Sequence, residues 1–337
     1  MMYLSILIRM LVTTALLWFF VSRIDIAYAI TLISALSPLR CGIAIVLLAA
    51  AAPINAIRWR IILGLEGKPP TFPRLFGVLL IGLFFNQVLP TGIGGDAVRA
   101  WRLRDFGFDL GVSIRSILLD RAVGYCVFVL MYVINLPLLL PLVSDQKQRW
   151  ALIAIAVATT CGIFVLLIIN ALRGVLSRFP AIAPIAMLSR RAWALCTDIR
   201  QLAAVLALSG ASSALTILSV MVLADGLDVR LSFATWFLIM PPVILVQLVP
   251  ISLAGWGVRE TALIVMLAVF RAPTENALAV SLLVGLSQLA CALPGGIIWL
   301  AGADIGIARG SSLWRKYRAE MIDAPSLSAP VSRDLGA

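Results

Sequence analysis

Six stretches of this sequence are apolar for long enough to cross a lipid bilayer as helices. The hydrocarbon core of a bilayer is about 30 Å thick, which takes ~20 helical residues. A helix also satisfies its own backbone N–H and C=O groups, which lipid cannot do. These runs predict an all-α polytopic membrane protein of about six to eight transmembrane helices. They cover approximately residues 4–22, 41–57, 117–142, 150–170, 202–224 and 277–302.

The composition agrees with a chain built for lipid. Hydrophobic residues make up 62% and charged residues 13% of it, whereas an average soluble domain carries roughly 25% charged residues. Histidine, the commonest general base and metal ligand, is absent from the sequence. The five cysteines are scattered singly, so neither a disulfide nor a metal site is expected. We predict no cofactor.

A motif that contains Pro, Gly and Arg occurs twice, at 87–99 and 247–259, each time directly after an apolar run. Short hydrophobic segments interrupted by Gly or Pro at matching places in two halves indicate a transporter's binding site. The sequence therefore predicts two repeated halves, about 1–142 and 150–303, within a membrane domain of residues 1–308. The identical pairs, each separated by 160 residues, are Gln87 and Gln247, Pro90 and Pro250, Gly95 and Gly255, Val98 and Val258, and Arg99 and Arg259.

The net charge of +11 is concentrated in a few segments, which indicates cytoplasmic loops and not nucleic-acid binding. Most lysines and arginines fall in 58–74, 99–115, 171–200 and the tail from 309. The intervening segments 23–40, 143–149, 225–232 and 271–276 hold few. By the positive-inside rule the first group is cytoplasmic.

Three further apolar runs are short and adjoin the repeated motif: 75–89 stops at Pro90, and 233–249 and 258–270 flank the second copy. With the charges placed as above, 75–98 enters the membrane from the cytoplasm and returns there, and 233–270 does the same from outside. Both are predicted to be re-entrant hairpins, and the halves are inverted relative to each other. The alternative is that 75–90 spans, which gives nine crossings and places the basic segment 99–115 outside.

The two ends of the chain carry separate expectations. Residues 1–29 end in Ala27-Tyr28-Ala29, which resembles a signal-peptidase site, but Arg23 and Asp25 interrupt the apolar stretch before it. We therefore predict a retained first helix, with both termini cytoplasmic. Residues 309–337 are predicted to form a cytoplasmic and largely disordered tail.

Charged residues follow each break. A half-helix that begins after a Gly-rich break directs its N–H groups at the break, which favours an anion. Asp96 and Arg99 follow the first break, and Arg259 and Glu260 the second. An ionised side chain costs at least ~2.5 kcal/mol at the bilayer centre unless it is paired or hydrated. The functional interpretation is that the arginines bind a phosphate and the acids orient or neutralise them; the alternative is that the arginines pair structurally or extend to the membrane surface.

A further candidate is Arg121 at the start of the run 117–142. Adjacent residues on a helix point in different directions, so Arg121 is expected to pair with a residue other than Asp120, such as Asp96. The alternative is a charge at the cytoplasmic boundary. Polar amides within apolar runs, including Gln288, line a cavity or bridge helices. The candidate substrate-binding residues, with no catalytic residue or metal ligand among them, are Asn86, Gln87, Gly94, Gly95, Asp96, Arg99, Arg121, Gln247, Gly255, Trp256, Gly257, Arg259 and Glu260.

Several of these motifs together resemble the lysylphosphatidylglycerol synthase transmembrane-region family, whose members are called flippase-like proteins. The resemblance covers roughly residues 10–305. This sequence has Asp120 where the family pattern has Glu before Arg121. The motifs are Asn86-Gln87-Val88-Leu89-Pro90, Gly94-Gly95-Asp96, Val98-Arg99-Ala100, Asp120-Arg121-Ala122-Val123-Gly124, Gly255-Trp256-Gly257-Val258-Arg259-Glu260 and Leu293-Pro294-Gly295-Gly296.

The resemblance implies a multi-pass protein of the bacterial inner membrane that moves amphipathic lipids between leaflets. In the best-known members the bundle precedes a soluble aminoacyl-lipid synthase domain, which this sequence does not contain, so lysine transfer is not expected. An aminoacyl phospholipid, a polyprenyl-phosphate-linked lipid and a hopanoid-type lipid all remain open. The implied partners are membrane lipids and a lipid-modifying enzyme or glycosyltransferase; an oligomer is compatible and nucleic acid is not expected.

Two other functions remain as alternatives. The first is a non-transporting accessory subunit of a glycosyltransferase or lipid-modifying enzyme. The second is a membrane-embedded enzyme that uses Asp96 and Glu260 as acid and base, which the lack of histidine and of a DxD-type metal motif disfavours.

Overall fold

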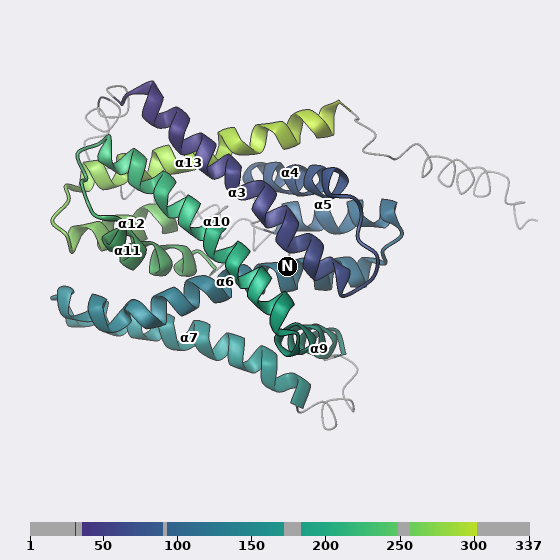
Figure 1. Cartoon of the computed structure of the whole chain (residues 1–337). Coiled ribbons are helices and arrows are strands. Elements are labelled where there is room, and N and C mark those ends of the chain that lie inside the picture. The colour runs from purple at the N-terminus through teal and green to yellow at the C-terminus, as the bar shows by residue number, and fades with distance from the viewer. Residues whose placement is uncertain (1–30, 32–35, 90–92, 172–182, 249–256, 302–337) are drawn as a thin grey trace, which may run out of the picture.

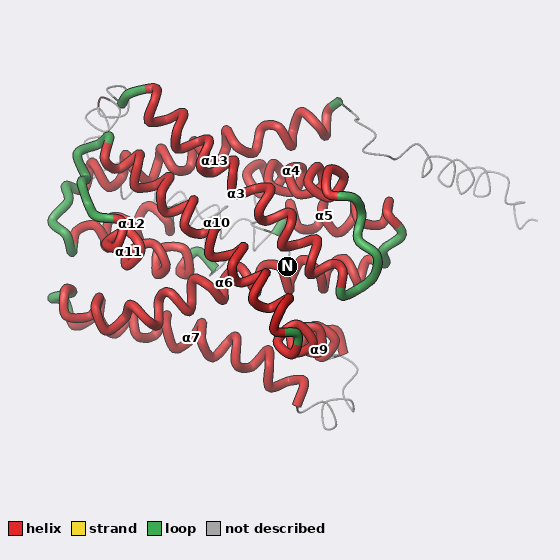
Figure 2. Tube along the Cα trace, in the orientation of Figure 1, coloured by secondary structure: helices red, strands yellow, loops and turns green. Residues whose placement is uncertain are grey.

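The computed structural model describes residues 31, 36–89, 93–171, 183–248 and 257–301 (Figure 1). Within these ranges the regular structure consists of helices (Figure 2), which confirms the all-α prediction. The α-helices are α3 (Pro38–Gly64), α4 (Phe72–Val88), α5 (Gly94–Leu103), α6 (Leu110–Leu139), α7 (Gln146–Ala171), α9 (Ala183–Thr197), α10 (Ile199–Asp225), α11 (Phe233–Val246), α12 (Val258–Ala268) and α13 (Thr274–Leu300). Short 3₁₀ turns, Arg104–Phe106 and Leu140–Leu142, follow α5 and α6.

Five of these helices, α3, α6, α7, α10 and α13, are long and apolar enough to cross a membrane. They correspond to five of the six predicted runs, and the sixth, 4–22, lies outside the described residues. Helix α3 is longer than the run 41–57 that predicted it. The prediction assigned Arg58 to a cytoplasmic loop, and this is wrong, because Arg58 lies inside α3 and is buried.

The same order of helices occurs twice. A long helix, two short helices and a long helix form α3–α6, and the same series forms α10–α13. The contacts are reciprocal: α4 packs on α13, α11 packs on α6, and α3 packs along α10. At the α4–α13 contact, a Cβ added to Gly295 would overlap the carbonyl oxygen of Leu80. The repeat predicted from the motif therefore appears in the order and packing of the helices, while the inversion of the halves across a membrane stays a prediction.

Each half contains a pair of short helices on either side of a break. Helix α5 runs back along α4: Gly95 near its start packs on Gly82 and Asn86, and Leu103 at its end shares a buried cluster with Leu75. Helices α11 and α12 also pack against each other. The hairpin that the sequence predicted at 75–98 is thus present as two packed helices. Whether it enters and leaves on one side of the membrane stays a prediction.

Cysteine labelling tests the predicted topology. In a variant with the five native cysteines changed to serine, Asp228→Cys after α10 should react from outside in intact cells. Lys68→Cys between α3 and α4 should react only after permeabilisation, because this segment is predicted to be cytoplasmic. Both Asp228 and Lys68 are exposed in the structure, so the reagent can reach either position. Labelling of both positions from the same side would contradict the inverted arrangement.

Candidate functional site

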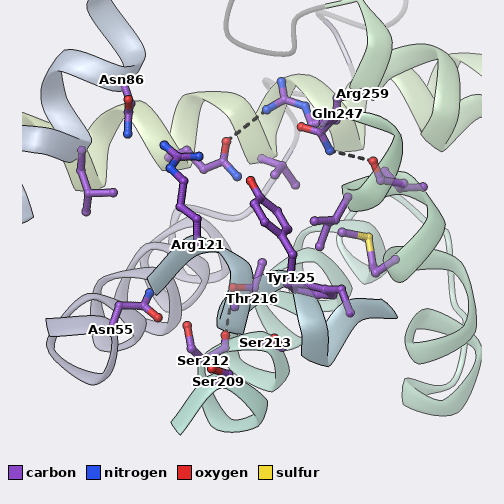
Figure 3. Close-up of a pocket in the computed structure, with 18 of the residues that line it drawn as sticks. Asn55, Asn86, Arg121, Tyr125, Ser209, Ser212, Ser213, Thr216, Gln247 and Arg259 are labelled. Carbon is purple, nitrogen blue, oxygen red and sulfur yellow. Dashed lines mark hydrogen bonds between the residues drawn. The ribbon is translucent and has the colours of Figure 1, made fainter. Parts of the chain in front are cut away.

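A cavity of about 360 Å³ lies between the two halves of the chain. Each of the eight helices α3–α6 and α10–α13 supplies at least one residue of its lining, and Gln247, directly after α11, also lines it. Figure 3 shows serine and threonine side chains of α10 below the cavity, and Arg121 and Arg259 above them. The charged lining residues are Arg58, Arg99, Asp120, Arg121 and Arg259.

A chain of alternating charges joins α3, α6 and α5 at this cavity. Arg58 Nε donates to Asp120 Oδ1 at 2.9 Å, and Arg99 Nη2 donates to Asp120 Oδ2 at 3.2 Å. Arg99 Nη1 contacts Asp96 Oδ1 at 3.4 Å, and Arg121 forms an ion pair with the other oxygen of Asp96. Each carboxylate therefore bridges two arginines. Such bridging offsets the cost of removing these charges from water.

Packing around Arg99 holds its guanidinium in place. The Arg99 Cζ atom lies 3.9 Å from the centre of the Trp59 ring, in cation–π geometry. The Trp59 indole N–H donates to Ser116 Oγ at 3.4 Å, which fixes the ring. A Cβ added to Gly82 would overlap the Arg99 side chain, so only glycine lets this arginine pass along α4. The site thus depends on the close approach of α4 and α5.

The second half places its charges differently. Arg259 Nη2 donates to Glu260 Oε1 at 2.7 Å, Arg259 Nε to Ser281 Oγ at 3.2 Å, and Arg259 Nη1 to Gln288 Oε1 at 3.2 Å. Glu260 Oε2 accepts the backbone N–H of Gly257 at 2.5 Å, which caps the start of α12. Gly257 has φ +86°, a left-handed conformation that favours glycine. Glu260 therefore both closes the helix end and neutralises Arg259.

The structure brings together most of the predicted site residues. The predicted pairing of Arg121 with Asp96 is present. Arg99 and Arg259 are only 7% and 8% exposed, so they do not extend to the surface, and both are paired with the neighbouring acid and line the cavity. Their role in binding a substrate stays a prediction.

The predicted glycines and amides have different roles. Gly94 and Gly95 form the start of α5, where the Gly95 N–H donates to Asn86 Oδ1 at 2.9 Å. Gln247 lines the cavity and donates to the Val243 carbonyl at 2.8 Å. Gln87 is half-buried and is not among the described lining residues. The predicted residues Gly255 and Trp256 lie outside the described residues.

Sequence reasoning missed two parts of the site. Arg58 was missed because the apolar pattern was ended too early, although Trp59, Ile62 and Leu63 continue it on the same helix. The second part is a hydroxyl face on α10, where four residues at helical i, i+3, i+4 and i+7 spacing line the cavity. That spacing was a usable signal. The four residues are Ser209, Ser212, Ser213 and Thr216.

Two apolar pockets adjoin the polar cavity. One, of about 320 Å³, lies between α7, α11 and α12 and shares Val243 with the cavity. The other, of about 410 Å³, lies between α6, α7, α9 and α10 and shares Tyr125 with it. The polar site is therefore flanked by space suited to hydrocarbon.

The fold and site define a polytopic helical membrane protein with a buried charged cavity between two similarly built halves. The chain belongs to the lysylphosphatidylglycerol synthase transmembrane-region family, whose profile, described as "Lysylphosphatidylglycerol synthase TM region", matches residues 6–295. It is also similar to a "UPF0104 membrane protein" of Methanothermobacter thermautotrophicus, with 29% identity over 122 residues. That alignment covers 36% of this chain and 34% of the relative. The profile match over residues 6–295 confirms the family resemblance that the sequence motifs indicated.

Proposed function

We propose that this protein moves an anionic amphipathic lipid between the leaflets of the bacterial inner membrane, with both termini on the cytoplasmic side. The observation that carries the proposal is the arginine-lined cavity adjoining two apolar pockets. Arginine suits the planar, bidentate recognition of a phosphate. A lipid presents the same two chemistries, since its phosphate matches the cavity and its hydrocarbon chains match the pockets. We propose no catalytic activity for the chain.

The position of the cavity supports an alternating mechanism. It lies between two halves that exchange reciprocal contacts through α4–α13 and α11–α6. Rocking of one half against the other around a fixed central site is a common transport mechanism. The sequence lacks the Lys-Ser/Thr ending of a P-loop in its Gly-rich segments. We propose that movement follows a gradient of the lipid or of an ion.

Translocation by purified protein in proteoliposomes tests this function. Fluorescent phosphatidylglycerol should move between leaflets faster than in protein-free vesicles. Loss of one charge-assisted contact is worth ~1.5–3 kcal/mol, or roughly 10- to 150-fold in affinity. The variant Arg259→Lys keeps the charge but loses the two parallel N–H donors of the guanidinium. We therefore expect its translocation rate to fall by roughly tenfold, the lower end of the range given for affinity.

The matched control for this variant is Arg60→Lys. Arg60 is an exposed arginine of α3 that donates to the Pro70 carbonyl and does not line the cavity. Its rate should equal that of the wild type. A wild-type rate from well-folded Arg259→Lys would rule out phosphate binding by Arg259. No translocation above protein-free vesicles would favour an accessory subunit over a transporter.

A further inference from the structure

The three carboxylates at the cavity are already occupied by donors of the protein. Both oxygens of Asp120 accept hydrogen bonds from arginines, and both oxygens of Asp96 form ion pairs with arginines. Glu260 accepts from Arg259 and Ser281 on one oxygen and from a backbone N–H on the other. Their side chains are only 5%, 8% and 1% exposed. An ammonium group entering the cavity therefore meets acids that are buried and already paired.

The charge balance of the site points the same way. The described residues that line the cavity or pair with its arginines include four arginines and three acids, which leaves one positive charge in excess. One phosphate diester carries the single negative charge that balances it. An additional cationic group would restore the imbalance in a buried setting, where unpaired charge is costly. The arginines are Arg58, Arg99, Arg121 and Arg259, and the acids are Asp96, Asp120 and Glu260.

The rest of the polar lining is uncharged. Hydroxyl groups come mainly from α10, with one each from α6 and α13, and amides come from α3, α4 and α13 and from the residue after α11. Figure 3 labels the amides Asn55, Asn86 and Gln247. Hydroxyls and carboxamides both donate and accept hydrogen bonds, which matches the hydroxyl groups of a glycerol or a sugar. The lining residues concerned include Asn55, Asn86, Ser212, Thr216, Gln247 and Gln288.

We infer that the lipid headgroup accepted here is a phosphate ester whose remaining part is uncharged and hydroxylated, and that headgroups carrying an ammonium are rejected. This inference rests on the proposed lipid transport. It selects among the three lipid classes that the sequence left open: an aminoacyl phospholipid such as a lysyl ester is excluded, and a glycerol or sugar attached to a lipid phosphate is favoured. A headgroup without phosphate does not use the arginines.

A comparison of the translocation rates of three fluorescent lipids tests the inference. Wild-type protein in phosphatidylcholine vesicles is supplied with one of three fluorescent probes: phosphatidylglycerol, its lysyl ester, or a polyprenyl-phosphate hexose. Movement to the outer leaflet is followed by quenching with an impermeant reductant. At least one of the two uncharged-head lipids should move roughly tenfold faster than the lysyl ester or more, the factor given by about 1.4 kcal/mol.

A designed change of preference makes the test independent of folding. Ser212 lines the cavity and is 8% exposed. The variant Ser212→Asp adds a carboxylate at the cavity and removes the excess positive charge, so the lysyl ester should gain on phosphatidylglycerol. Ser212→Asn has nearly the same size without the charge and should keep the wild-type order of rates.

The outcomes distinguish failure of this inference from failure of the proposed lipid transport. Equal or faster movement of the lysyl ester by wild-type protein would overturn the inference while leaving lipid transport in place. An unchanged order of rates in folded Ser212→Asp would also overturn it. Movement of none of the three probes would overturn the proposed function and this inference together.

Discussion

Replacing Asp120 with alanine should destabilise the protein by about 3–5 kcal/mol, the usual cost of removing one partner from a buried ion pair. Asp120 is 3% exposed and accepts hydrogen bonds from Arg58 and Arg99. Without it Arg58 keeps only its bond to Ser209 among the described residues, at 3.1 Å, and the cluster gains a net positive charge inside the bundle. The free energy of unfolding in mixed detergent micelles measures this loss.

Two matched variants show whether the loss arises from buried charge. Asp228→Asn removes the charge of an acid that also pairs with an arginine, but this side chain is 80% exposed, so its effect should stay within about 1 kcal/mol. Asparagine is used here because Asp228 has φ +58°, a left-handed conformation that asparagine tolerates better than alanine. The double variant Arg58→Leu, Asp120→Leu removes one charge of each sign and should recover a large part of the stability. Equal losses from Asp120→Ala and Asp228→Asn would contradict the buried ion cluster.

Replacing Gly95 with alanine should disrupt both stability and the site. A Cβ at this position would overlap the Gly82 carbonyl and lie 2.7 Å from the Asn86 side chain, so the α4–α5 pair must separate. Overpacking costs typically 1–3 kcal/mol, and backbone on the opposing helix leaves little room for adjustment. Because Asp96 and Arg99 follow on the same helix, we also expect translocation to fall more than the loss of folded protein explains.

The control for this substitution is Gly42→Ala. Gly42 lies in α3 with no atom within 4 Å of an added Cβ, and alanine is favoured over glycine in a helix by about 1 kcal/mol. This variant should be as stable as the wild type or slightly more stable. Thermal unfolding and the translocation assay are measured on both variants. Wild-type stability and activity in Gly95→Ala would show that α4 and α5 do not need this close approach.

The sequence by itself determined the class of the protein and the location of its repeated motif. Long apolar runs predict helices because lipid leaves backbone groups no other partners, and α7, α10 and α13 follow those runs closely. The helix break in the first copy of the motif, after α4, is also where the sequence placed it, because Pro lacks a backbone N–H and Gly disfavours the helix. The same residue types do not always end a helix, since Pro294, Gly295 and Gly296 lie inside α13. These signals are local, so they can be read without knowing what the segments contact.

The sequence anticipated the Arg121–Asp96 pair, but only the tertiary structure decided how the other charges of different helices meet. Arg58 and Asp120 are 62 residues apart, and nothing in their spacing reveals a contact that depends on how α3 crosses α6. The hydroxyl face of α10 becomes part of the site only because that helix packs along α3 and faces the cavity. Composition and periodicity fix which side chains a helix offers on each face. Which helix packs against that face depends on contacts between segments that are distant in the sequence. These contacts bring the arginines and acids together, and their charge balance is the basis on which we infer the lipid.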